Sequence, residues 1–340
     1  MSHPPAPTTR RRPDPASSSP LRARPHWLRT LPMMLGSGAL LAVQSQVNGA
    51  LADSLGTGLR AGTLAALISF GSGLAVLSGF ALAHPPTRQG VAGLLRGVRR
   101  RTVPHWLVLG GLGGAFFVVS QGLAAGALGI TFFVLCFVAG QAVTALLVDH
   151  RGWGPQGATA LSGMRVTGAG LALLAVGISG AGLAAAVALT AALVLLAALP
   201  LLAGSVNSVQ QGMNGRLATR FGPWVTTWNN FAVGTLGLSV FLAAALAAPG
   251  RIVGLPPQPW LYLGGLCGIG FIWASTVTVR VHGVLVVGVF AVAGQVLAAA
   301  VMAAAGSGSA PPPATLLAAL TSLAGAAVVG LSTRGPSPAA

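Results

Sequence analysis

Long apolar segments recur along the chain and constrain its fold more than any other feature. Ten of them approach or exceed the roughly 20 residues that a helix needs to cross a bilayer core of about 30 Å. They cover residues 31–51, 59–83, 104–125, 127–148, 163–182, 188–213, 223–248, 257–279, 282–304 and 313–332. Charged residues make up only 6% of the sequence, whereas soluble domains carry about 25%. The sequence therefore predicts an all-α integral membrane protein with ten transmembrane helices.

The arginines are distributed unevenly between the loops that join these segments. The formal net charge is +16, and all 19 basic residues are arginine. If the N-terminus lies inside, every arginine except Arg60 and Arg251 falls on the cytoplasmic side, as the positive-inside rule requires. This pattern predicts a multi-pass protein of the cell inner membrane with both termini cytoplasmic. Because the arginines lie between apolar segments and not on a folded soluble face, we expect no nucleic acid partner.

The two ends of the chain differ in composition from the apolar part. Residues 1–28 are rich in Pro, Ser and Arg, and such a segment cannot bury enough apolar surface to fold. We expect a disordered basic cytoplasmic tail over 1–28, a retained first span after it, and a short C-terminal tail over 335–340. Cys136 and Cys267 both lie inside apolar segments, and we interpret them as small core residues and not as a disulfide or metal pair.

One motif occurs twice. Val-Gln-Ser-Gln-Val-Asn-Gly at 43–49 returns as Val-Gln-Gln-Gly-Met-Asn-Gly at 209–215. Gln44 and Asn48 are four residues apart, as are Gln210 and Asn214, so each pair lies on one face of a helix. Amides are costly in hydrocarbon unless they find a partner. The two pairs therefore predict a polar seam in a duplicated membrane protein.

The duplication extends well beyond this motif. Residues 106–148 align without a gap on residues 260–302, and Val-Ala-Gly-Gln recurs at 138–141 and 292–295. We therefore predict two repeats of five spans, over residues 29–183 and 184–334. Because five is odd, the second repeat enters the membrane upside down. Inverted repeats with a binding site at their interface are typical of secondary transporters.

The motifs also resemble a known family. Leu-Leu-Ala-Val-Gln-Ser-Gln-Val-Asn-Gly-Ala-Leu (40–51), Ala-Gly-Gln (139–141) and Leu-Leu-Val-Asp-His (146–150) resemble the YdcZ-like branch of the drug/metabolite transporter (DMT) superfamily. The resemblance covers about 31–332, as two five-span modules fused end to end. It implies an EamA-like fold of ten helices in a bacterial inner membrane, and secondary transport. The second half departs from the pattern, with Ala303-Ala304 where the first has Asp149-His150.

Amide side chains inside apolar segments are the candidate substrate-binding residues. They are Gln44, Asn48, Gln210, Asn214, Gln141, Gln295 and Asn230. Their alternative role is to join helices, through hydrogen bonds worth about 1 kcal/mol or less. That role is favoured for Gln141 and Gln295, which each follow a glycine. Asn229 and Asn230 point to different faces of a helix, so at least one lines a cavity or a partner helix.

Asp149 and His150 end the fourth span and are candidates for coupling or gating. Histidine titrates near neutral pH, which suits proton coupling. The alternative, which we favour, is an interfacial ion pair at a helix end. No carboxylate falls in the middle of a predicted span, which argues against exchange of a cation for protons on a central acid.

These observations favour a DMT-superfamily secondary transporter that moves a small polar or amphipathic solute by alternating access. The alternative is a membrane scaffold or sensor that uses the same helices to bind a partner. An enzyme is disfavoured because the sequence has no paired acids within a span, no His-x-x-Glu-His motif and no Gly-x-Ser-x-Gly motif. We expect no cofactor and no metal. The expected partners are the solute and membrane lipid, and the chain is predicted to act as a monomer or a homodimer.

Overall fold

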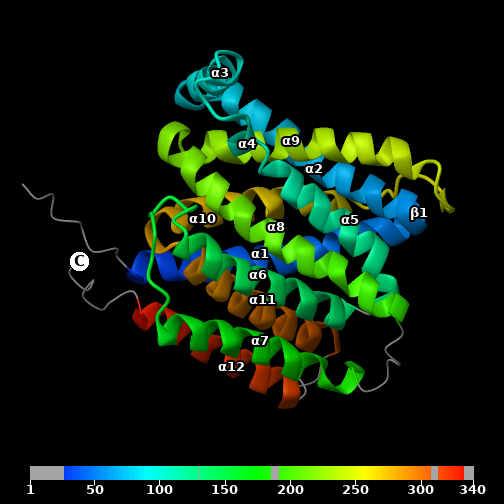
Figure 1. The fold of residues 1–340 in the computed structure, drawn as a ribbon. Helices are drawn as coiled ribbons and strands as arrows, with labels where there is room; N and C mark the ends of the chain where they lie inside the picture. Colours follow the sequence, from blue (N-terminus) through cyan, green and yellow to red (C-terminus); the bar gives the residue numbers. More distant parts are fainter. Residues whose placement is uncertain (1–26, 129, 185–190, 308–312, 333–340) are drawn as a thin grey trace, which may run out of the picture.

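The computed structural model describes residues 27–128, 130–184, 191–307 and 313–332, so most of both predicted tails lies outside the described residues (Figure 1). Helices dominate the fold. They are α1 (Trp27–Leu55), α2 (Gly58–Ala83), α3 (Pro85–Arg99), α4 (His105–Val108), α5 (Gly111–Leu128), α6 (Ile130–His150), α7 (Gly163–Ala184), α8 (Ala191–Phe221), α9 (Pro223–Ala245), η1 (Pro259–Tyr262, a 3-10 helix), α10 (Gly264–His282), α11 (Val284–Ser307) and α12 (Pro313–Ser332). Two short strands are β1 (Gly56–Thr57) and β2 (Gly250–Ile252).

A helix covers each of the ten predicted apolar segments. In the described part of the chain, six helices are long and apolar enough to cross a membrane, namely α2, α6, α9, α10 with η1, α11 and α12. The apolar stretches of α5 and α7 are shorter, over Gly111–Ala124 and Gly163–Ile178. The prediction of an all-α membrane protein is confirmed.

Three local features were not predicted. α3 lies between α2 and α4, with Leu94 packed against Val103 and Leu217 and its arginines exposed. The third segment is divided into α4 and α5, and the eighth into η1 and α10. In addition, β1 pairs antiparallel with β2, with Thr57 opposite Arg251. Low hydropathy hides α3 from a search for apolar segments, and strands of two and three residues leave no periodic pattern.

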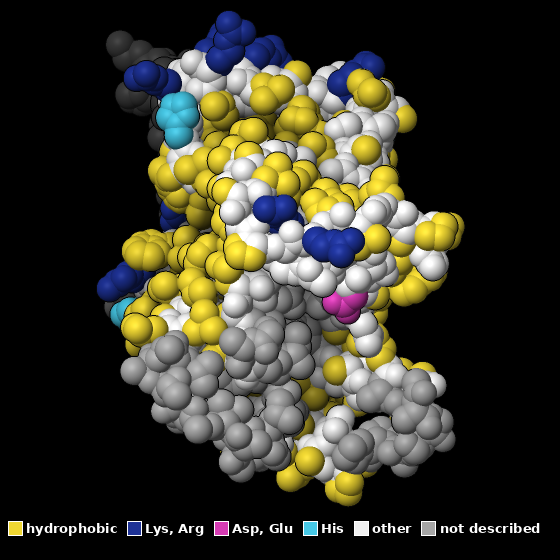
Figure 2. Space-filling model, turned by 90° about the vertical axis from the view of Figure 1, so that its right-hand side faces the viewer, with side chains coloured by type: hydrophobic (Ala, Val, Ile, Leu, Met, Phe, Trp, Pro, Cys, Tyr) yellow, Lys and Arg dark blue, Asp and Glu magenta, His cyan; other side chains and the backbone are white. Residues whose placement is uncertain are grey.

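The β1–β2 ribbon marks one end of the molecule, which we call the arginine-poor end. Both arginines predicted to face outside lie there: Arg251 belongs to β2, and the Arg60 guanidinium donates a hydrogen bond to the Ala248 carbonyl at 2.7 Å. Figure 2 views the molecule from this side, where many of the described side chains are hydrophobic.

The opposite end, which we call the arginine-rich end, gathers most of the described arginines, which lie on α3, on the ends of other helices and in the loops that join them. Arg216 of α8 donates to the Gly152 carbonyl at 2.6 Å, and Arg220 donates to the Thr102 carbonyl at 2.9 Å. These bonds tie the end of α8 to the α6–α7 loop and to the loop after α3. In Figure 1 the loops of this end lie toward the left and β1 lies at the right.

Glycines allow two pairs of helices to pack with their backbones in contact. α1 packs on α11, and α8 packs on α6. An added Cβ on any of four glycines would overlap the backbone of the opposing helix: Gly38 on Ala291, Gly294 on Leu35, Gly204 on Phe137, and Gly140 on Leu201. Such small residues are what close helix approach in a membrane requires. The two helix pairs place α1 and α8 on either side of a central cavity.

Candidate functional site

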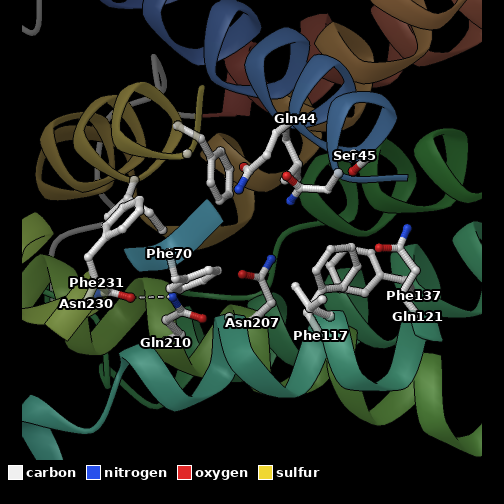
Figure 3. A pocket seen from close by; sticks show the side chains of 17 residues that line it. Gln44, Ser45, Phe70, Phe117, Gln121, Phe137, Asn207, Gln210, Asn230 and Phe231 are labelled. Carbon is white, nitrogen blue, oxygen red and sulfur yellow. Dashed lines mark hydrogen bonds between the residues drawn. The ribbon is translucent and has the colours of Figure 1, made fainter. Parts of the chain in front are cut away.

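Amide side chains from four helices surround a cavity between α1 and α8, which we call the amide chamber (Figure 3). Its volume is about 50 Å³. The polar lining residues are Gln44, Ser45 and Asn48 of α1, Asn207 and Gln210 of α8, Gln121 of α5, and Asn230 of α9. The aromatic lining residues are Phe70, Phe117, Phe137, Phe231 and Phe271. The chamber therefore combines hydrogen-bonding groups with flat apolar walls.

A chain of hydrogen bonds fixes the amides on the α8 side. Gln210 Nε2 donates to Asn230 Oδ1 at 2.7 Å, and Asn230 Nδ2 donates to Asn214 Oδ1. All three side chains are buried, with exposed fractions of 3% or less. Because each donor already has an acceptor, the hydrogen bonds hold the Gln210 side chain in one orientation at the chamber wall.

Two amide oxygens at the chamber have no hydrogen-bond partner among the described residues. They are Gln210 Oε1 and, on the α1 side, Asn48 Oδ1. A buried acceptor without a donor costs about 1–3 kcal/mol. Gln210 Oε1 lies against Gly113 and Asn48 Oδ1 lies against Gly264, so these two oxygens face neighbouring backbone and not the open part of the cavity.

Glycines just before α5 and at the start of α10 make room for these amides. The Asn48 oxygen lies where a Cβ on Gly264 would be, and the Asn214 oxygen lies 2.7 Å from a Cβ built on Gly110. Gly110 and Gly264 are equivalent in the ungapped alignment of the two halves. Each motif helix thus places its asparagine against a glycine of the other half.

The chamber continues into a wider pocket of about 380 Å³. The two share Leu41, Ser45, Phe117, Gln121 and Phe137. The other residues that line the wide pocket include Phe133 and Val134 at the start of α6, Val176 of α7, Gln295, Val296 and Ala299 of α11, and Thr315 of α12. Most of these lie in the halves of their helices that are remote from the α6–α7 loop, so the wide pocket extends toward the arginine-poor end.

A separate pocket of about 370 Å³ lies at the arginine-rich end. Its lining residues are Trp106, Val148, Trp153, Val209, Met213 and Arg216. It shares none of them with the amide chamber. Among the pockets lined by described residues, the chamber therefore adjoins the wide pocket and not this one.

The predicted candidates do not all lie together. Gln44, Asn48, Gln210 and Asn230 line the chamber, and Asn214 joins it through Asn230. Gln295 lies in the wide pocket. Gln141 is apart from both, and its side chain lines a small cavity between α6 and α11. The Ser208 hydroxyl donates a hydrogen bond to the Gln141 backbone carbonyl at 2.8 Å.

Sequence reasoning missed several lining residues. Asn207 lies three residues before Gln210, and Gln121 lies four residues after Phe117, so each pair shares a helix face. A search for polar residues three or four positions before the motif at 209–215 would have found Asn207. The five phenylalanines carry no such signal, because phenylalanine inside a membrane span is usual whether or not a cavity adjoins it.

Asp149 joins three helices at the arginine-rich end. Its carboxylate accepts hydrogen bonds from the backbone N–H groups of Val284 and Leu285, at 2.8 and 3.0 Å, and forms an ion pair with Arg165. The N-terminus of a helix favours a carboxylate in this position, and Gly283, with φ +85°, allows α11 to begin beside it. We call this group the Asp149 cluster. His150 is exposed and lies outside it.

Comparisons with known proteins identify the family and the fold of the chain. The sequence model of a family described as "Putative inner membrane exporter, YdcZ" matches residues 30–179 and residues 195–331. A protein of known crystal structure matches with a TM-score of 0.63, covering 92% of this chain and 99% of its own, at 21% sequence identity, and so shares the fold. No curated protein matches the chain. Each of the two family segments contains one copy of the repeated amide motif.

Proposed function

This chain belongs to the YdcZ family of inner membrane proteins, and we propose that it is a secondary transporter with its solute site in the amide chamber. The solute is small and polar or amphipathic. It crosses the membrane by alternating access between two inverted five-helix repeats, residues 29–183 and 184–334, in an EamA-like arrangement. The observation that carries the proposal is the position of the chamber, between the two helices that bear the repeated motif.

Equivalent contacts in the two halves support an inverted repeat. α1 packs on α11 as α8 packs on α6, while α2 pairs with α9 and α7 pairs with α12. An approximate two-fold axis between the halves would exchange the α1–α11 contact with the α8–α6 contact. It would map the α2–α9 contact and the α7–α12 contact each onto itself. Transporters of this kind bind their solute on such an axis, because rocking one half against the other exposes the site to each side in turn.

The two ends of the molecule support alternating access. The chamber continues toward the arginine-poor end, while the Asp149 cluster holds α6, α7 and α11 together at the arginine-rich end. We propose that the arginine-rich end is cytoplasmic, by the positive-inside rule, and that the Asp149 cluster is the gate there. His150 lies next to Asp149 in sequence and is the second gating candidate. We propose that Gln141 joins neighbouring helices and that Gln295 forms part of the wall of the wide pocket.

A ligand screen tests the proposal. The purified protein is heated in the presence of a broad panel of metabolites and drugs, since a ligand that binds only the folded state raises its apparent stability. We expect at least one stabilising compound, and we expect Gln44→Ala/Gln210→Ala to abolish its effect. The matched control is Gln141→Ala, an equally buried amide outside the chamber, which should retain it.

The outcomes separate the site from the function. A stabilising compound that is taken up by proteoliposomes, but is unaffected by the double variant, would keep transport and remove the site from the chamber. A protein that no compound stabilises and that transports none of them would contradict the proposal and favour the scaffold or sensor.

A further inference from the structure

We infer that the pocket of about 370 Å³ at the arginine-rich end binds the headgroup of an anionic membrane phospholipid. We call it the tryptophan pocket, and its lining residues are Trp106, Val148, Trp153, Val209, Met213 and Arg216. None of them lines the amide chamber, so the inference goes beyond the proposed function and does not depend on the solute. Three observations carry it: the state of the Arg216 side chain, the charge around the pocket, and the apolar surface beside it.

The Arg216 guanidinium is held in place without a countercharge among the described residues. Its Nε donates to the Gly154 carbonyl at 3.3 Å and its Nη2 donates to the Gly152 carbonyl at 2.6 Å. These bonds use two of the five N–H donors of the group. The only carboxylate that the structure describes at this end, Asp149, is already paired with Arg165. Because a guanidinium binds phosphate through parallel hydrogen bonds, a phosphate group would both compensate the charge and use the remaining donors.

Further arginines gather around the pocket. Arg151 lies over one of the two tryptophan rings, with 5.3 Å between the guanidinium carbon and the ring centroid. Arg220 follows Arg216 by one helical turn and donates to the Thr102 carbonyl, next to the exposed Arg101. An arginine near the membrane surface raises the affinity for anionic lipid about fivefold, which corresponds to about 1 kcal/mol. The charge at this end therefore selects an anionic headgroup over a zwitterionic one.

The walls of the pocket suit a lipid better than a soluble anion. Trp106 is 50% exposed and Trp153 is 48% exposed, and tryptophan is enriched where lipid headgroups meet water. α8 lies between α4 and α6 and contacts both (Figure 1). On either side of the pocket, exposed apolar side chains continue from the arginine-rich end into the membrane, namely Leu109 and Leu112 after α4, and Leu147 and Val143 of α6. A headgroup in the pocket therefore leaves its acyl chains against an apolar surface.

A comparison of two lipids tests the inference. The purified full-length protein in detergent micelles is titrated with phosphatidylglycerol, or with phosphatidylcholine that carries the same acyl chains, and bound lipid is counted by native mass spectrometry. We expect phosphatidylglycerol to bind at least fivefold more tightly. Inorganic phosphate should not displace it, because phosphate has no acyl chains to hold it at the pocket.

Variants assign the preference to the pocket. In Arg216→Gln, the ratio of the two affinities should fall to within twofold. Arg280→Gln is the matched control, because it removes an exposed arginine at the same end of the molecule that does not line the pocket, and it should keep the ratio. Trp106→Leu leaves both Arg216 hydrogen bonds intact, and should weaken phosphatidylglycerol binding at least threefold.

Every other outcome contradicts the inference. Equal affinities for the two lipids, a preference that survives in Arg216→Gln, or unchanged binding in Trp106→Leu would show that the headgroup does not bind in the pocket. Loss of the preference in Arg280→Gln as well would show that net charge, and not the pocket, attracts the lipid. Displacement by inorganic phosphate would assign the pocket to a soluble anion. The ligand screen of the amide chamber is independent of all these results.

Discussion

At the scale of single residues, the Asp149 carboxylate has more partners than any other charged group that the sequence singled out. The sequence predicted an interfacial ion pair at the end of the fourth span but did not identify its partner. The actual partner is Arg165, after the α6–α7 loop, and two further donors come from the start of α11. Only the packed fold brings these three elements together, so no local pattern could have identified them.

Asp149→Asn should destabilise the protein strongly. Both Asp149 and Arg165 are about 95% buried, and removal of one partner from a buried ion pair costs about 3–5 kcal/mol, because the other charge stays buried and uncompensated. We expect a loss of that size in the free energy of unfolding, measured with denaturant in detergent.

Two comparisons check the cause of this loss. Asp53→Asn removes an exposed carboxylate and should change the free energy of unfolding by less than about 0.5 kcal/mol. Asp149→Asn/Arg165→Met should recover part of the loss, since the unpaired charge is gone. A single Asp149→Asn variant as stable as the parent would show that the ion pair has no role in holding α6, α7 and α11 together.

At the scale of elements, hydropathy predicted where helices lie but not where they end or bend. α8 continues to Phe221, past the predicted end at residue 213, because its last turns are polar and pack against the loops of the arginine-rich end. The sequence also places a glycine before each of Gln141 and Gln295, without showing what that glycine contacts. The fold shows that Gly140 packs on Leu201 of α8 and Gly294 packs on Leu35 of α1.

Gly38→Ala should destabilise the protein, whereas Gly36→Ala should not. Both glycines lie in α1, but a Cβ on Gly38 would overlap the Ala291 backbone of α11, while a Cβ on Gly36 would meet nothing within 4 Å. Overpacking of this kind costs about 1–3 kcal/mol, whereas Ala in place of an unconstrained helical Gly stabilises by up to about 1 kcal/mol. Thermal unfolding in detergent measures both variants, and equal midpoints would contradict the α1–α11 contact.

At the scale of the whole molecule, the repeated amide motif indicated more about the chamber than any other part of the sequence did. It predicted that Gln44 and Gln210, which are far apart in sequence, belong to one polar seam, and both line one chamber. It did not indicate which other helices enclose that chamber, because α2, α6 and α10 line it with aromatic, aliphatic and glycine residues, which carry no distinctive pattern. The chamber was thus half predictable, from its amides and not from its walls.

Alternating access predicts opposite changes in the two halves when solute binds. Single cysteines at Asn48 and Asn214, in a background where Cys136 and Cys267 are replaced by alanine, should change their rates of labelling by a membrane-impermeant thiol reagent in opposite directions. Ser54→Cys, at the exposed end of α1, is the control and should not change. Labelling at both chamber positions that is equal and independent of solute would contradict the rocking of one half against the other.

The Asp149 cluster also has a kinetic meaning, because the two halves of the chain differ there. The aligned position in the second half is Ala303, so in the proposed alternating access only closure of the arginine-rich end gains this ion pair. We therefore expect the two resting orientations to differ in free energy, with the empty protein mostly in the one whose arginine-poor mouth is available. Apparent affinity falls with the fraction of molecules competent to bind. Net flux still follows the solute gradient, but half-saturation should require less solute at the arginine-poor face than at the arginine-rich face.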